Sequence, residues 1–106
     1  MNKNVKKRAA SELKAHRARR TALECMALRG EKTEGTAVKA AVDAVELALG
    51  GLHPDDRYLL TEFYVDRADG SFDRLRSCFD CSESSVYRKK RLALERFAMR
   101  LFGSVE

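Results

Sequence analysis

Residues 71–103 read SFDRLRSCFDCSESSVYRKKRLALERFAMRLFG. Ser71 can cap a short helix and Ser82 a longer one, because a serine side chain accepts a hydrogen bond from the free backbone N–H groups of a helix start. Residues 79–81 lie between the two helices and are few enough to form a tight turn. The pattern therefore predicts two helices joined by a turn over residues 71–102, which is the layout of a helix-turn-helix.

The apolar residues of this stretch recur at helical spacing, as expected for faces that point into a core. The inward set consists of Leu75, Phe79, Cys81, Val86, Ala93 and Phe97. Polar residues and the basic run RKKR at positions 88–91 are left on the outside. The second helix is therefore amphipathic and cationic.

A helix in the major groove presents its N-terminal residues to base edges, while nearby cations neutralise phosphates. The candidates for base edges or the groove are Ser84, Tyr87, Arg88 and Arg91, with Ser85 beside them. The candidates for phosphate contacts are Arg74, Arg76, Lys89 and Lys90. The sequence therefore predicts binding of double-stranded DNA through the helix over residues 82–102.

The net charge of +5 is unevenly distributed. Residues 1–29 carry nine Lys or Arg and two acids, residues 30–69 carry four and nine, and residues 70–106 carry eight and five. Cationic ends favour a polyanionic partner such as nucleic acid, although an acidic protein would also fit. Anionic lipid fits less well, because no strongly apolar face accompanies the charge.

Residues 1–29 are predicted to form a long basic helix, since positions 4–28 contain neither Gly nor Pro. Its apolar stripe is thin, so the helix needs the rest of the chain or a second copy of itself for stability. Residues 30–36, GEKTEGT, indicate a polar linker, and residues 37–106 a helical DNA-binding domain. Three roles stay open for the long helix: a second DNA-contacting arm, a homodimer interface, or a docking surface for RNA polymerase.

Two further helices are expected before the basic stretch. Thr36 can cap one over residues 37–49, which a Gly-Gly pair ends. Pro54, in the sequence LHPDD, opens another, because proline has no N–H to leave unpaired in a first turn and acids there complement the helix dipole. Its predicted core face consists of Tyr58, Leu59, Leu60, Phe63, Tyr64 and Val65. The chain is therefore predicted to be all-α.

The cysteines and histidines predict neither a metal site nor catalysis. Cys78 and Cys81 form a CxxC, but a closed zinc site needs four ligands and no second CxxC exists. His53 is explained by its place at a helix start and His16 by solvation in a charged helix. The adjacent acids of LHPDD have no nucleophile near them. We therefore expect no enzyme, no cofactor and no metal.

The cellular location is predicted from what the chain lacks. No apolar run is long enough for a signal peptide core or a membrane span. Three cysteines are an odd set, which argues for reduced thiols rather than a disulfide framework. The expectation is a cytoplasmic protein without a membrane partner.

Residues 52–66, LHPDDRYLLTEFYVD, and the run from residue 71 to ALERFA at 93–98 resemble region 4 of bacterial sigma factors. They resemble still more closely the ArpU/RinA-like transcriptional regulators of phages and prophages in Gram-positive bacteria. The resemblance covers about half of the chain in detail. It implies a sequence-specific DNA-binding regulator of phage late genes that acts with RNA polymerase or a sigma factor.

Two positions depart from the pattern of these regulators. Asp80 stands where the turn commonly has Gly, a mild change because Asp tolerates the left-handed backbone conformation better than most residues. Arg76 stands where the first helix commonly has a small residue. It must extend its charge to solvent, pair with Asp73 or Asp80, or mark a shifted register.

Two other functions fit the same residues. A phage DNA-packaging adaptor, similar to a small terminase subunit, would also join DNA-binding helices to oligomerising ones, and it would form rings. A protein-only adaptor that binds RNA polymerase or a sigma factor would have no specific affinity for DNA.

Overall fold

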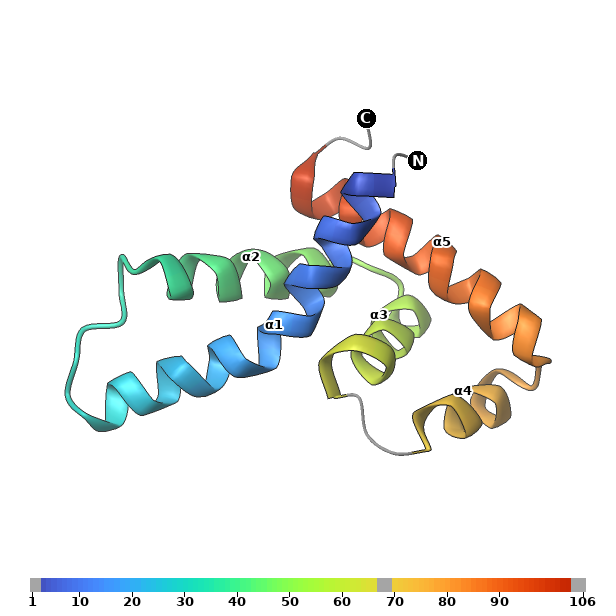
Figure 1. Ribbon diagram of the computed structural model, residues 1–106, viewed down its shortest axis with the longest axis horizontal. Helices are drawn as coiled ribbons and strands as arrows, with labels where there is room; N and C mark the ends of the chain where they lie inside the picture. The colour runs from blue at the N-terminus through green and yellow to red at the C-terminus, as the bar shows by residue number, and fades with distance from the viewer. Residues whose placement is uncertain (1–2, 67–69, 104–106) are drawn as a thin grey trace.

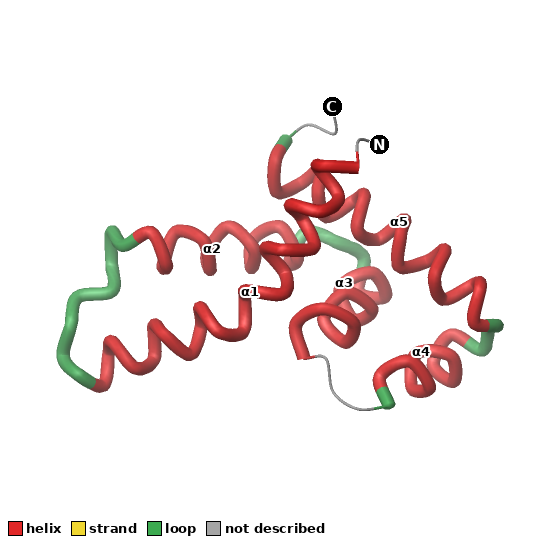
Figure 2. The backbone as a smooth tube through the Cα atoms, viewed as in Figure 1, coloured by secondary structure: helices red, strands yellow, loops and turns green. Residues whose placement is uncertain are grey.

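The computed structural model describes residues 3–66 and 70–103 (Figure 1). The elements are α1 (Lys3–Leu28), α2 (Ala37–Gly50), α3 (Pro54–Leu60), the π-helical turn η1 (Thr61–Asp66), α4 (Ser71–Phe79) and α5 (Glu83–Phe102). Helices and the loops between them account for every described residue, and no strand occurs among them (Figure 2). The predicted all-α class is confirmed.

The helices form two parts that share α1. Helices α1 and α2 run antiparallel as a hairpin that extends to one side of α3, α4 and α5 (Figure 1). Helix α1 also packs against η1, where the Arg17 side chain bonds to the Asp66 carbonyl, and against α5. The long basic helix therefore lies on the body of the protein.

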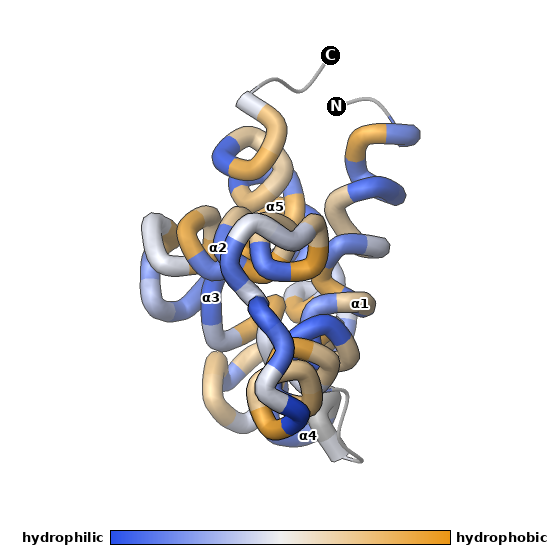
Figure 3. The backbone as a smooth tube through the Cα atoms, turned by 90° about the vertical axis from the view of Figure 1, so that its left-hand side faces the viewer, coloured by the Kyte–Doolittle hydropathy of each residue, from blue (hydrophilic) through white to orange (hydrophobic). Residues whose placement is uncertain are grey.

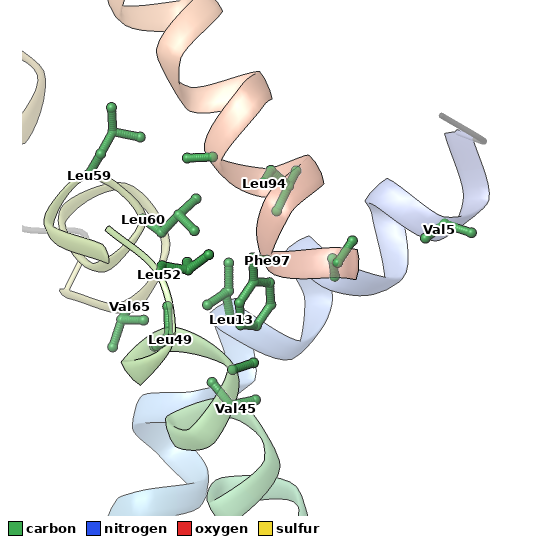
Figure 4. Close-up of a cluster of buried hydrophobic side chains, with 14 of the residues drawn as sticks. Val5, Leu13, Val45, Leu49, Leu52, Leu59, Leu60, Val65, Leu94 and Phe97 are labelled. Atoms are coloured by element: carbon green, nitrogen blue, oxygen red, sulfur yellow. The ribbon is translucent and has the colours of Figure 1, made fainter. Parts of the chain in front are cut away.

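One hydrophobic core joins α1 to α5 among the described residues. Each helix contributes a fully buried side chain to it: Leu13, Val45, Leu60, Leu75 and Phe97, in chain order. Figure 4 shows Leu13 beside Phe97, with Leu52 and Leu60 close to them. Burying a leucine or phenylalanine side chain contributes about 1.5–3 kcal/mol, so this core fixes α1 on α5.

Local sequence explains most of the helix ends. The Thr36 hydroxyl accepts a hydrogen bond from the Lys39 N–H (3.1 Å), as predicted for the cap of α2. Gly30 ends α1 with a left-handed φ of +75°, and the Glu31 N–H donates to the Met26 carbonyl (2.9 Å). This is the arrangement that glycine adopts most readily after a helix.

The predicted cap of α4 is wrong by one residue. Gly70, not Ser71, occupies the position before the helix, and its φ is +79°. Its carbonyl accepts the first helical hydrogen bond, from the Arg74 N–H (3.0 Å). Only glycine reaches such a φ without a steric penalty, so the turn ends at Gly70 and Ser71 already belongs to the helix. The pair Asp69-Gly70 in the sequence also favours a break in the chain here, and Asp69 lies outside the described residues.

The third predicted helix begins as expected at Pro54, and the His53 ring Nδ1 accepts a hydrogen bond from the Asp55 N–H (3.1 Å). Leu59, Leu60 and Val65 are buried, and Phe63 and Tyr64 are partly buried against the core. The prediction that Tyr58 belongs to the core is wrong. It is exposed, and its ring packs edge-on against Phe79 at 6.5 Å between centroids, because that side of α3 faces the rim of the core.

The prediction that His16 is solvated is also wrong, since only 3% of this residue is exposed. Helix α2 covers this face of α1 and places the Glu46 carboxylate 3.8 Å from the His16 Nε2. The Nδ1 atom has no hydrogen-bond partner among the described residues. Burial lowers the pKa of His16; Glu46 opposes this shift, and Arg20 and Arg19 add to it.

Candidate nucleic-acid interface

The turn between α4 and α5 is held by backbone hydrogen bonds. Asp80 has the left-handed angles φ 48° and ψ 54°, which confirms that it takes the place usually given to glycine. The Cys81 N–H donates to the Arg76 carbonyl (3.2 Å) and so closes the end of α4. The Cys81 side chain is partly buried against the core and fills the turn.

The register of α4 and α5 follows the predicted inward set. Leu75, Val86, Ala93 and Phe97 are buried, and Phe79 packs against the core. Arg76 is exposed and forms no ion pair with a described acid. The neighbouring Leu75 fills the interior position, so the arginine needs neither a partner nor a shifted register.

Serines cluster at the start of α5. The Ser82 hydroxyl accepts a hydrogen bond from the Ser85 N–H (3.4 Å) and lies 3.1 Å from the Ser85 hydroxyl. Ser85 is half-buried, so it belongs to the cap of the helix rather than to its outer face. Ser84 is exposed one residue earlier, with its hydroxyl 3.3 Å from that of Ser82.

The four cations at positions 88–91 point in three directions, because successive helical residues lie about 100° apart. Arg88 and Arg91 are exposed and have no hydrogen bond or ion pair with a described residue. The Lys89 ammonium lies on the side facing α3, 5.5 Å from the centre of the Phe79 ring. Together with Ser84 and the exposed Tyr87, Arg88 and Arg91 form what we call the outer face of α5.

Lys90 lies at the edge of this outer face, beside Tyr87. Its ammonium lies over three aromatic rings, 5.1 Å from the centre of Phe63, 5.8 Å from Tyr64 and 5.2 Å from Tyr87. Burial lowers the pKa of Lys90, and the nearby Lys14 of α1 lowers it further. Lys90 therefore joins α5 to η1. Of the two predicted phosphate contacts on α5, it is less exposed to solvent than Lys89.

Arg74 also takes part in a contact between helices. Its guanidinium donates to the Glu62 carboxylate of η1 at 2.9 Å, and Glu62 is largely buried. This hydrogen bond raises the pKa of Arg74. Arg74 therefore positions α4 on η1, while Arg76 remains on the exposed side of α4.

Two basic residues of α5 that were not singled out in the sequence have structural roles. The Arg96 guanidinium donates to Asp56 of α3 (2.9 Å). The Arg100 Nε donates to the Ala48 carbonyl (3.0 Å) at the end of α2, and its guanidinium covers Gly51 so closely that a Cβ there would collide with it. A cation at a helix C-terminus complements the helix dipole. These partners are distant in sequence, so no local pattern could have revealed them.

The side of α5 that faces α3 borders a groove of about 570 Å³. Its lining combines the apolar side chains of Leu59, Phe79 and Leu92 with charged ones such as Asp55 and Lys89. The groove therefore lies on a different side of α5 from the outer face that carries Arg88 and Arg91.

The cysteines bring no metal cluster together in the part of the chain that the structure describes. Cys25, Cys78 and Cys81 are free thiols. No three His, Cys, Asp or Glu side chains of residues 3–66 and 70–103 gather closely enough to hold an ion. A membrane-spanning helix is likewise not found within these residues.

Comparison with known proteins adds no relative. Neither protein-family models, nor curated proteins, nor solved structures gave a match to this chain. The resemblance to phage regulators therefore rests on the residues from position 52 to 103 alone.

Proposed function

We propose that the protein is a sequence-specific regulator of transcription whose helix-turn-helix, α4 and α5, binds double-stranded DNA. The observation that carries this proposal is the outer face of α5, where Arg88 and Arg91 have no acceptor among the described residues. Other arginines near them, such as Arg74 and Arg96, already bind acids of the chain. The resemblance to phage late-gene regulators supports the same function, with RNA polymerase or a sigma factor as a further partner.

The major groove admits an α-helix, and each base pair presents a distinct set of donors and acceptors there. An arginine on such a helix can donate two hydrogen bonds to guanine, which is worth about 1–3 kcal/mol of discrimination. Arg88 is one helical turn from both Ser84 and Arg91, so all three side chains lie on one face of α5 and can contact the same part of the groove. The N-terminal half of α5 thus reads bases, and the exposed Arg76 of α4 contacts a phosphate.

The test is selection of bound sequences from fragments of the neighbouring genome, at two salt concentrations, with wild type and with Arg88→Ala plus Arg91→Ala. We expect one enriched site, which the double variant no longer distinguishes from random DNA. Arg76→Ala is the matched control: it should weaken both sequences equally and reduce the salt slope by about one unit, as expected for a phosphate contact. Binding without any enriched sequence would contradict this function, and rings in sedimentation would then favour a packaging adaptor.

A protein-only adaptor is the second candidate, and the groove between α3 and α5 favours it. Apolar side chains contribute to the groove, and one of them, Leu92, is 37% exposed. A groove with apolar, acidic and basic lining residues suits an amphipathic helix of a partner protein. This function predicts that Arg88→Ala plus Arg91→Ala keeps full activity, whereas Leu92→Glu abolishes it without altering any affinity for DNA.

A further inference from the structure

The cations of α1 differ in their contacts with the rest of the chain. Those facing α2 or η1 are bound to the chain: the Arg17 guanidinium donates to the Asp66 carbonyl (3.3 Å) and Arg20 lies 3.9 Å from Glu46. Lys3, Lys7 and Lys14 are exposed and have no acceptor among the described residues. At about 100° per residue these three lysines lie within about 40° of one another around α1. We call this strip the lysine face of α1.

The Lys14 end of the lysine face lies near Lys90, at the edge of the outer face of α5. Lys14 is close enough to Lys90 for the two ammonium groups to repel, and Lys90 in turn lies 5.2 Å from the ring centre of Tyr87. Farther along, the Arg8 guanidinium carbon is 4.4 Å from the centre of the Phe102 ring. Helix α1 therefore crosses α5 in its C-terminal half (Figure 1) and does not cover the outer face with Arg88 and Arg91.

No acid of α1 offsets this charge. Glu12 bonds to Arg19 on another face of the helix, and Glu24 lies near its far end. Hydrophilic and hydrophobic residues alternate along both α1 and α5 (Figure 3), so each helix keeps one face for the core and one for solvent. Unpaired like charges on adjacent helices disfavour the free protein and favour a polyanion that neutralises both. DNA phosphates provide such a row of charges at close spacing along the duplex.

We propose that the lysine face of α1, carrying Lys3, Lys7 and Lys14, binds the phosphate backbone of the same DNA duplex that α5 reads. This inference rests on the proposed function and extends it to the N-terminal helix. Lys7 and Lys14 are seven residues apart, about 10 Å along the helix, and therefore reach different phosphates. Because the core fixes α1 on α5, these contacts set how the recognition helix lies in the groove.

The experiment compares wild type with Lys7→Gln plus Lys14→Gln in the full chain, by fluorescence anisotropy on the selected site and on a random duplex over a series of salt concentrations. We expect weaker binding to both duplexes by the same factor, between about tenfold and sixtyfold at 0.1 M salt. The slope of log affinity against log salt should fall in magnitude by about 1.8, or 0.9 for each lost phosphate contact. The ratio between the two duplexes should stay unchanged.

Two control variants make the result specific to the lysine face. Arg29→Gln plus Lys32→Gln removes the same charge at the tip of the hairpin, and it should leave the slope unaltered. Lys7→Arg plus Lys14→Arg keeps the charge and should bind as wild type does. Both lysines are exposed, and loss of Lys14 relieves repulsion with Lys90, so the glutamine variant should melt no lower than wild type.

The outcomes separate this inference from the proposed function. An unchanged slope in the Lys7 and Lys14 glutamine variant, together with lost specificity in the Arg88 and Arg91 variant, would overturn the inference and leave the function standing. An equal loss in the hairpin-tip control would overturn it too, because total charge would then explain the effect. If wild type bound no duplex, the function itself would fail first.

Discussion

The imidazole of His16 lies between α1 and α2, with its Nε2 3.8 Å from the Glu46 carboxylate. Its Nδ1 has no acceptor or donor among the described residues, so a proton added to this ring would be poorly compensated. Burial is the largest cause of its lowered pKa, and Arg20 and Arg19 of the same helix act in the same direction. Folding therefore favours the neutral form of His16.

We predict that acidification destabilises the protein through His16. The folded pKa lies below the ordinary value of 6.5, so between the two values the unfolded chain binds a proton that the folded chain excludes. The free energy of unfolding is then highest above pH 6.5 and falls as the pH drops toward the folded pKa. Thermal melts followed by circular dichroism at pH 8 and pH 5.5 measure the loss.

Two histidine variants assign the effect. His16→Leu should reduce the drop in Tm between the two pH values, because the titrating group is gone from the interface between α1 and α2. His53→Gln should keep the full drop, since His53 is exposed at the start of α3. An identical drop in wild type and in His16→Leu would show that carboxylates alone cause it.

Single residues also show where sequence reasoning succeeds. Thr36, Ser82 and Asp80 were predictable because a cap or a left-handed turn depends on a few neighbouring residues. His16 was not, because its burial depends on α2, which returns to cover it some thirty residues later. The contact between Arg100 and the Ala48 carbonyl was not predictable either, because its two residues are also distant in sequence.

At the scale of elements, α1 was the hardest to interpret from sequence. Its thin apolar stripe allowed packing on the rest of the chain or pairing with a second copy of the helix. The structure selects packing on the chain's own core, through Val5, Ala9 and Leu13. This packing was difficult to predict from the sequence, because many cations surround these three apolar residues along the helix.

A pair of matched substitutions tests the packing of α1. Leu13→Ala should cost about 2–5 kcal/mol of unfolding free energy, because Leu13 is 0% exposed within the core. Leu28→Ala, in the same helix, should cost less than about 0.5 kcal/mol, because Leu28 is 87% exposed. Urea titration at 25 °C measures both. Equal costs would mean that α1 does not pack on the body in solution.

The π-helical turn η1 is the second element that sequence did not reveal. Leu60 and Val65 are five residues apart, and in an α-helix they would lie about 140° from each other. Both are buried in the same core. The wider turn brings them to one side, and thereby places Phe63 and Tyr64 under the Lys90 ammonium. Periodicity of 3.6 residues could not predict this adjustment.

At the scale of the whole molecule, the shared core predicts cooperative unfolding. The three tyrosines lie one each in α3, η1 and α5: Tyr58, Tyr64 and Tyr87. Tyrosine fluorescence therefore reports on the part of the protein formed by these elements, whereas far-UV circular dichroism also includes α1 and α2. In guanidinium with reducing agent, the two signals should give one coincident transition. A first step seen only by circular dichroism would show instead that the α1–α2 hairpin unfolds separately.

The crossing of α1 over α5 also limits how much a single protein molecule can distinguish. Only the outer face in the N-terminal half of α5 is exposed for reading bases, and Ser84 to Arg91 span about 10 Å, or roughly three to four base-pair steps. Each base pair specifies two bits, so one protein molecule reads about six to eight bits, and its target recurs by chance every few hundred base pairs at most. A genome offers about a million or more competing positions. A site that is unique in the genome therefore requires several such short sequences at fixed spacing. They must be read by more than one protein molecule, or by one molecule together with a polymerase already bound at the promoter.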